Sequence, residues 1–160
     1  MCKLGLKVYL IDVDNKASKM ENIQQWVQKG LLEIYPIQSK LVEDSLRSRT
    51  LKPGSKPVSQ PQGYLELVDL ITKWEKEPPE GSLENGVVVL DSMSKVEEHM
   101  VRLISYLGVA EGYDKWRIVK GNYAFYAGHC CQAAGLRSGK VILTGRHLTF
   151  FMEKGCFYKK

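Results

Sequence analysis

Strongly apolar runs alternate with amphipathic segments along most of the chain. Three of these runs are rich in β-branched residues and almost continuously apolar: 6–14 (LKVYLIDVD), 87–91 (VVVLD) and 140–145 (KVILTG). Such runs are typical of strands that are covered on both faces, as in parallel sheets. A shorter run at 31–37 (LLEIYPI) predicts a further strand.

The segments between these runs have helical spacing. A capping box of Ser18 and Glu21 predicts the start of a first helix, which Gly30 ends. Further helices are expected at 64–77, from Lys95 to a stop at Gly108, and at 123–135. The residues expected to face inward are Met20, Ile23, Trp26 and Val27 in the first helix, Leu67, Leu70, Ile71 and Trp74 in the second, and Val96, Met100, Leu103, Ile104 and Leu107 in the third.

Two segments have the composition of turns and loops. Residues 48–63 contain several prolines, glycines and hydroxyl residues, which predicts a long flexible loop. Residues 148–160 predict a terminal hairpin that turns at 153–155. Because strands alternate with helices, the sequence predicts one α/β domain over residues 1–160, with three layers and a mainly parallel sheet.

Composition indicates the general class of protein and its expected location, but it says little about the function. Of 160 residues, 44% are hydrophobic and 26% charged, as in ordinary globular proteins, and the net charge of +5 permits an anionic partner. No apolar run approaches the roughly 20 residues that cross a bilayer, so we expect a cytoplasmic protein with no membrane partner. The four cysteines form no C-x-x-C pair and predict reduced thiols rather than a zinc site.

Polar side chains stand at the carboxyl ends of three predicted strands, where open parallel sheets bind ligands. Carboxylates, a hydroxyl, a guanidinium and an imidazole would meet there, which is the set that a site for magnesium and phosphate uses. The residues are Asp12 and Asp14, Asp91 and Ser92, and Thr144, Arg146 and His147. Taken singly, the aspartates and Ser92 also fit a simpler role as caps of the helices that follow them.

Three strings, "KVYLIDVDNKA", "GVVVLDSMS" and "KVILTGRHL", together resemble, in order, core strands of RecA-like or AAA-type P-loop ATPases of the phage recombination kind. The resemblance implies that ATP and Mg²⁺ bind at these strand ends. Asp91 would occupy the Walker B position and serve the metal, and Ser92, Thr144 and Arg146 would help to bind the nucleotide. Asp14 would be the catalytic carboxylate, where the family more often has Glu, and His147 would sense the γ-phosphate.

The phosphate loop of that family, G-x-x-x-x-G-K-[ST], does not occur in the chain. The nearest string, 134–141 (AGLRSGKV), has Ala134 for the first glycine and Val141 for the hydroxyl residue. The chain would therefore be a truncated core, an ATPase only if the loop is supplied upstream or by a partner. Without the loop's strand, the strand at 141–145 would be an exposed edge, which the terminal hairpin, self-association or a partner subunit should cover.

Residues 113–123 interleave basic and aromatic side chains, which predicts contact with single-stranded DNA. The candidates are Lys115, Trp116, Arg117 and Lys120. An ordinary amphipathic segment, with Trp116 buried and the charges solvated, explains the same pattern. A second basic candidate is the segment 47–56 (RSRTLKPGSK).

Three functions remain open at this point. The first is the ATP-binding core of an ATPase used in phage DNA recombination or replication, acting in the bacterial host cell. The second is a catalytically inactive α/β module that assembles with partners or DNA. The third is a receiver-like domain that binds Mg²⁺ through Asp12, Asp14 and Asp91, although the 79 residues from Asp12 to Asp91 are too many for that class.

Overall fold

The computed structural model describes most of the chain as far as residue 108 and shorter pieces beyond it. The residues that it describes are 2–38, 40–51, 53–55, 58–77, 79, 86–108, 112, 117–119 and, for the backbone, 140–144, 149–153 and 156–159.

Helices and strands follow one another in the mixed order that the sequence predicts. The strands are β1 (Lys7–Asp12), β2 (Leu32–Pro36), β3 (Leu41–Glu43), β4 (Ser59–Pro61), β5 (Gly86–Asp91), β6 (Lys140–Thr144), β7 (Thr149–Glu153) and β8 (Cys156–Lys159). The helices are η1 (Cys2–Leu4), η2 (Ala17–Lys19), α1 (Glu21–Gln28), α2 (Ser45–Arg49), α3 (Gly63–Lys76) and α5 (Met93–Tyr106).

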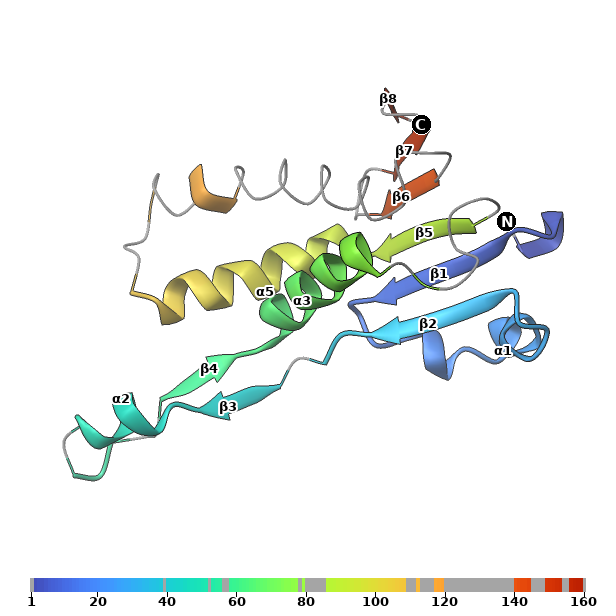
Figure 1. Ribbon diagram of the computed structural model, residues 1–160. Coiled ribbons are helices and arrows are strands. Elements are labelled where there is room, and N and C mark those ends of the chain that lie inside the picture. Colours follow the sequence, from blue (N-terminus) through green and yellow to red (C-terminus); the bar gives the residue numbers. More distant parts are fainter. Residues whose placement is uncertain are drawn as a thin grey trace.

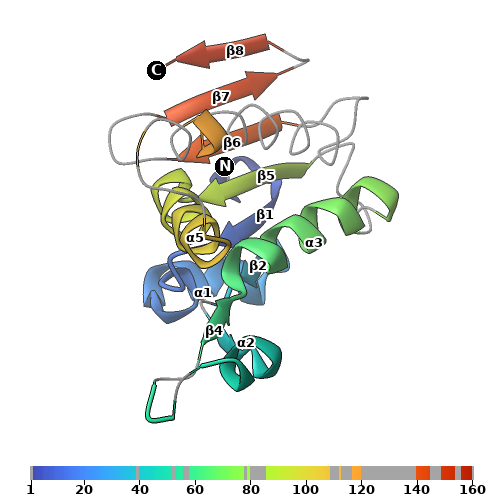
Figure 2. The ribbon, with the colours of Figure 1, turned by 90° about the vertical axis from the view of Figure 1, so that its left-hand side faces the viewer.

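Six strands form one sheet in the order β2-β1-β5-β6-β7-β8 (Figures 1 and 2). The first four strands in this order are parallel, and β7 and β8 are each antiparallel to the preceding strand. The chain therefore has the mixed α/β fold, with a parallel core sheet, that the alternation of elements predicts. No helix within the described ranges is long and apolar enough to cross a bilayer.

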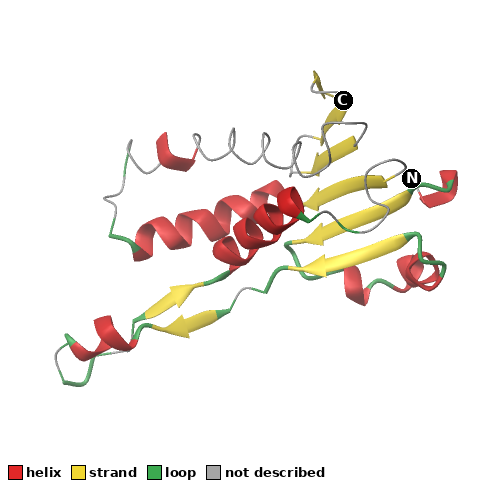
Figure 3. Cartoon of the chain, in the orientation of Figure 1, coloured by secondary structure: helices red, strands yellow, loops and turns green. Residues whose placement is uncertain are grey.

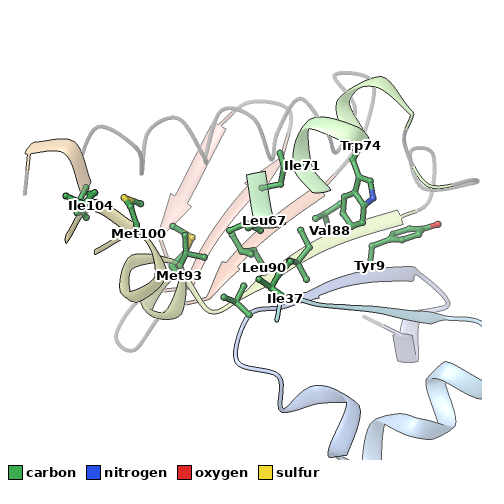
Figure 4. Close-up of a cluster of buried hydrophobic side chains, with 14 residues drawn as sticks. Tyr9, Ile37, Leu67, Ile71, Trp74, Val88, Leu90, Met93, Met100 and Ile104 are labelled. Atoms are coloured by element: carbon green, nitrogen blue, oxygen red, sulfur yellow. The ribbon is translucent and has the colours of Figure 1, made fainter. Parts of the chain in front are cut away.

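One face of the sheet carries the main hydrophobic core. Tyr9 and Ile11 of β1 lie in register with Val88 and Leu90 of β5, so all four side chains stand on the same face. Helices α3 and α5 cover this face with the buried residues Leu67, Ile71, Trp74, Val96, Met100 and Ile104 (Figure 4). The predicted inward stripes of these two helices are confirmed, except that Leu107 lies just beyond the last residue of α5 and is 56% exposed.

An aromatic group ties the edge of the sheet to α3. The ring of Trp74 meets Tyr9 and Tyr35 edge to face, with ring centroids 6.3 Å and 4.8 Å apart. Such pairs add about 0.5–1.5 kcal/mol to the burial of the rings themselves. The helix is thereby fixed across the two strands β1 and β2.

The first helix differs from its prediction. The capping box of Ser18 and Glu21 is wrong: Met20 is the N-cap residue of α1 and makes no side-chain cap bond. A short 3-10 turn, η2, occupies 17–19 instead, because the carboxylate of Asp12 accepts hydrogen bonds from the backbone there. No residue of α1 is buried, and Val27 is 37% exposed.

The segment predicted as a long loop, 48–63, contains secondary structure. The strands β3 and β4 pair antiparallel, with Val42 opposite Gln60, and α2 lies between them in the sequence. These elements form a ribbon that projects from the sheet (Figure 3). The side chain of Asp44 caps α2, and the backbone N–H of Asp44 bonds to the carbonyl of Val58. The prolines and glycines of 48–63 predict a loop. The ribbon forms nevertheless, because it depends on pairing between β3 and β4, which lie far apart in the sequence.

The terminal segment covers the edge of β6. Strand β7 pairs with the whole of β6, from Lys140 opposite Glu153 to Thr144 opposite Thr149, and β8 continues the hairpin. Of the covers that the sequence left open, the chain thus uses its own hairpin. A second subunit is not needed at this edge.

Removal of the hairpin should therefore cause association. A chain that ends at residue 147 exposes the backbone N–H and C=O groups of β6, so we expect dimers or aggregates in light scattering after gel filtration. A chain that ends at residue 155 keeps β7 and serves as the control. Equal masses for the 147-residue chain and the full chain at all concentrations would contradict this role of the hairpin.

Candidate functional site

The carboxyl ends of the four parallel strands lie at one edge of the sheet and align in register. Asp12 pairs with Pro36 of β2 on one side and with Asp91 of β5 on the other. Leu143 of β6 pairs with Leu90, which places the backbone of Thr144 at the level of Asp91. Three of the polar positions predicted for the site therefore form one row across neighbouring strands.

Asp12 is a structural residue of this row. Its side chain is 1% exposed, and its two carboxylate oxygens accept hydrogen bonds from the backbone N–H groups of Lys16 (3.3 Å) and Ala17 (2.8 Å). Both bonds hold the turn that follows β1. The simpler alternative, in which this aspartate orders the next helical turn, is therefore correct for Asp12.

Asp14 is held differently, two residues farther on. Its Oδ2 atom lies 3.4 Å from Nζ of Lys16, whose side chain is 74% exposed. Its Oδ1 atom is buried, and among the described residues it has no hydrogen-bond partner. Buried carboxylate oxygens are normally paired, so Asp14 offers an acceptor that the described part of the fold does not use.

The turn that presents Asp14 is fixed to the neighbouring strands. Asn15 has a left-handed backbone, φ +54°, and its side-chain amide donates to the carbonyl of Ile37. The N–H of Val13 donates to the carbonyl of Asp91 at 2.7 Å, so the turn continues the pairing with β5. The position of Asp14 relative to Asp91 therefore depends on backbone hydrogen bonds.

Asp91 and Ser92 join β5 to α5. The peptide bond between them is cis. Ser92 is the N-cap residue of α5, and its carbonyl accepts from the N–H groups of Lys95 (3.0 Å) and Val96 (3.1 Å). Its hydroxyl makes no cap bond, so the side-chain capping role proposed as the alternative does not apply to Ser92.

Buried His99 of α5 is a site residue that the sequence analysis missed. It is 4% exposed, and its imidazole hydrogen-bonds to the backbone of Val13, next to Asp14. Gly63, the first residue of α3, faces it so closely that a Cβ atom there would lie 2.7 Å from Nδ1 of His99. The spacing could have revealed it, because His99 lies three residues after Val96 on the buried stripe of α5.

Burial of the imidazole lowers the pKa of His99 below its ordinary value. The charges of Arg102 and Lys95 lower this pKa further. The charge of Glu98 and the hydrogen bond with the backbone of Val13 raise it. The neutral form is therefore favoured in the folded chain. The His99 side chain contacts Gly63 at the start of α3 and the backbone of Val13 in the turn that carries Asp14, so it links both to α5.

Only some of the other predicted site residues lie in the described part of the chain. Arg146 and His147, and the DNA-binding candidates Lys115, Trp116 and Lys120, lie outside the described residues. Arg117 is exposed, while the two residues that follow it contribute to the core, Ile118 at its margin and Val119 within it. Residues 117–119 are thus amphipathic, and the rest of 113–123, including Trp116, lies outside the described residues.

The described residues do not bring three or more His, Cys, Asp or Glu side chains together as a metal site. A receiver-like Mg²⁺ site built from Asp12, Asp14 and Asp91 is therefore not formed, and Asp12 is already occupied by the backbone. A site for Mg²⁺ and nucleotide needs fewer protein ligands, because phosphate oxygens and waters complete the coordination. Asp14 and Asp91 are sufficient in number for that chemistry.

Comparison of the chain with protein-family models, with curated proteins and with solved structures gave no match.

The two aspartates after β1 should differ in their effect on stability. Asp12→Ala leaves the N–H groups of Lys16 and Ala17 without their acceptor, and we expect it to lower the free energy of unfolding by about 1–3 kcal/mol. Asp14→Ala removes one contact with an exposed lysine and should change it by less than about 1 kcal/mol. Urea unfolding of both variants measures the difference, and equal losses would contradict the assigned roles.

His99 should make the stability depend on pH. Because its pKa is lower in the folded chain than the unfolded value of about 6.5, protonation favours the unfolded state. We expect the free energy of unfolding to be highest above pH 6.5 and to fall as the pH drops below that value. Urea titrations at several pH values should show a flatter profile for His99→Gln, and identical profiles would contradict this prediction.

Proposed function

We propose that the chain is the nucleotide-binding core of a RecA-like or AAA-type ATPase that acts on DNA, with its phosphate loop supplied from outside these 160 residues. The observation that carries the proposal is the row at the carboxyl edge of the parallel sheet, where Asp12 and Asp91 are in register and Asp14 keeps an unused buried oxygen. This edge is the place where open α/β sheets bind ligands. The three-layer, RecA-like form of the core is part of the same proposal.

In this proposal each residue has a distinct part. Asp91 orients water bound to Mg²⁺, and the metal supplies positive charge to the phosphates. Asp14 accepts a proton from, or orients, the attacking water. Ser92, Thr144 and Arg146 contact the nucleotide, and His147 responds to the γ-phosphate. Asp12 and His99 act indirectly, because they hold the turn on which Asp14 lies.

The experiment compares the chain alone with a polypeptide that also carries the phosphate loop, either the in-frame upstream sequence or a loop-bearing partner. We expect the chain alone to bind Mg·ATP no more tightly than about 1 mM, because backbone N–H groups of the loop supply the main phosphate contacts. With the loop present, ATP should bind and be hydrolysed. Fluorescent-nucleotide titration and phosphate release measure the two steps.

The role of Asp14 is tested in the loop-bearing form. Asp14→Asn should lower kcat by about 10²-fold or more while nucleotide affinity changes little, because the residue acts on water rather than on ATP. Asp69→Asn, an exposed position on α3, is the matched control. Tight Mg·ATP binding by the 160-residue chain alone, or full activity of Asp14→Asn, would refute the proposal.

A second candidate function is an inactive α/β module for assembly. It is favoured by the exposed aliphatic residues of the ribbon, among which Leu46 is 78%, Leu41 66% and Val42 51% exposed. Exposed apolar side chains of this size are available for contact with a partner. Absence of nucleotide binding even with a phosphate loop, together with retained association with a partner or DNA, would favour this function over the first.

A further inference from the structure

The described residues of the segment 40–62 form a projecting element that the proposed nucleotide site does not use; we call this segment the arm. It consists of β3, α2 and β4, and it extends away from the six-stranded sheet (Figures 1 and 3). All three residues of β3 are exposed, so this strand presents both of its faces to solvent. A strand that buries neither face contributes little to a core, which raises the question of what the arm contacts.

The arm is held in a fixed direction by the end of α5. The Tyr106 hydroxyl donates to Asp44, which caps α2, and this bond lowers the pKa of Asp44. The guanidinium of Arg47 lies 4.5 Å from the centre of the Tyr106 ring and donates to the Tyr106 carbonyl at 2.6 Å. These contacts, between residues about 60 positions apart, give the arm a defined position on the fold.

The arm carries a net positive charge, although it also contains Glu43 and Asp44. From Ser45 to Gln62 the sequence has four basic residues and no acidic one, and the whole arm carries +3 of the chain's net charge of +5. Among the described residues, Lys40 and Arg49 are exposed, and the Arg47 side chain is 48% exposed. The charge favours an anionic partner and disfavours contact between two arms, since both would be positive.

The composition of the arm favours one class of anionic partner. The arm has no aromatic residue, whereas sites for unpaired bases use aromatic stacking and protein interfaces are enriched in Tyr, Trp and Phe. From Ser45 to Gln62 it has five hydroxyl residues beside its Arg and Lys, the set that contacts phosphate and sugar. A two-stranded ribbon also fits the major groove of B-form DNA.

We propose that the arm binds duplex DNA, with Arg49 and Lys40 on phosphates. The exposed aliphatic side chain of Leu46 lies against the groove, where apolar contacts to thymine methyl groups or base steps are available. This site is separate from 113–123, for which the sequence predicts single-stranded DNA. It does not depend on the nucleotide site, so it is tested without ATP or Mg²⁺.

The experiment measures binding of the full chain to a labelled mixed-sequence duplex and to one of its single strands by fluorescence anisotropy, with EDTA present. We expect the duplex to bind more tightly, with an affinity that falls steeply between about 50 and about 200 mM salt. Arg49→Glu should weaken duplex binding by about tenfold or more and reduce the salt slope by about one. Arg49→Gln should give a smaller loss of the same kind.

Lys76→Glu is the control, because it makes the same change of charge at the exposed last residue of α3, at the opposite end of that helix from the one that follows the arm. It should weaken duplex binding by less than about twofold. Circular dichroism and thermal melting of each variant show whether the fold is retained.

Three results would overturn the proposal. The first is absence of duplex binding at low salt, and the second is an equal loss of binding for Lys76→Glu and Arg49→Glu. The third is binding to polyglutamate or to anionic lipid vesicles that is as tight as duplex binding and equally sensitive to Arg49→Glu, which would assign the arm to an acidic protein or a membrane surface.

Discussion

The parallel pairing of β1 with β5 is the constraint on which the rest of the structure depends. Its register sets Tyr9 and Ile11 beside Val88 and Leu90 on the face that α3 and α5 cover. The same register brings Asp12 level with Asp91 at the carboxyl edge. A shift by one residue would turn the apolar side chains to the other face, so burial of the core also fixes the geometry of the site.

Neighbouring acids at this edge differ in role because their surroundings differ. The oxygens of Asp12 are both used by backbone N–H groups, and the residue orders the turn after β1. Asp14, at the end of that turn, has a buried oxygen for which the described residues provide no donor. His99 supports the turn from α5, packed against Gly63. One carboxylate thus maintains the fold, while the next has a buried acceptor that the described residues do not use.

The fold covers the edge of one strand and leaves the arm exposed. The terminal hairpin extends the sheet beyond β6, which protects a strongly apolar parallel strand from pairing with another chain. The arm, in contrast, is inserted between β2 and α3 and exposes aliphatic and basic side chains instead of burying them. Contacts with Tyr106 hold the arm in place, so its exposure is a property of a positioned element.

The sequence by itself determined which segments are helices and which are strands, most of their limits, and the buried stripes of α3 and α5. It did so because the spacing of apolar residues within a segment indicates which of its side chains are buried. It also placed Asp12, Asp14 and Asp91 at strand ends. Only the tertiary structure decided that Asp12 caps a turn, that the Ser18 capping box does not form, and that 48–63 includes part of a ribbon. Those outcomes depend on hydrogen bonds between distant segments, such as Tyr106 with Asp44, which no local pattern encodes.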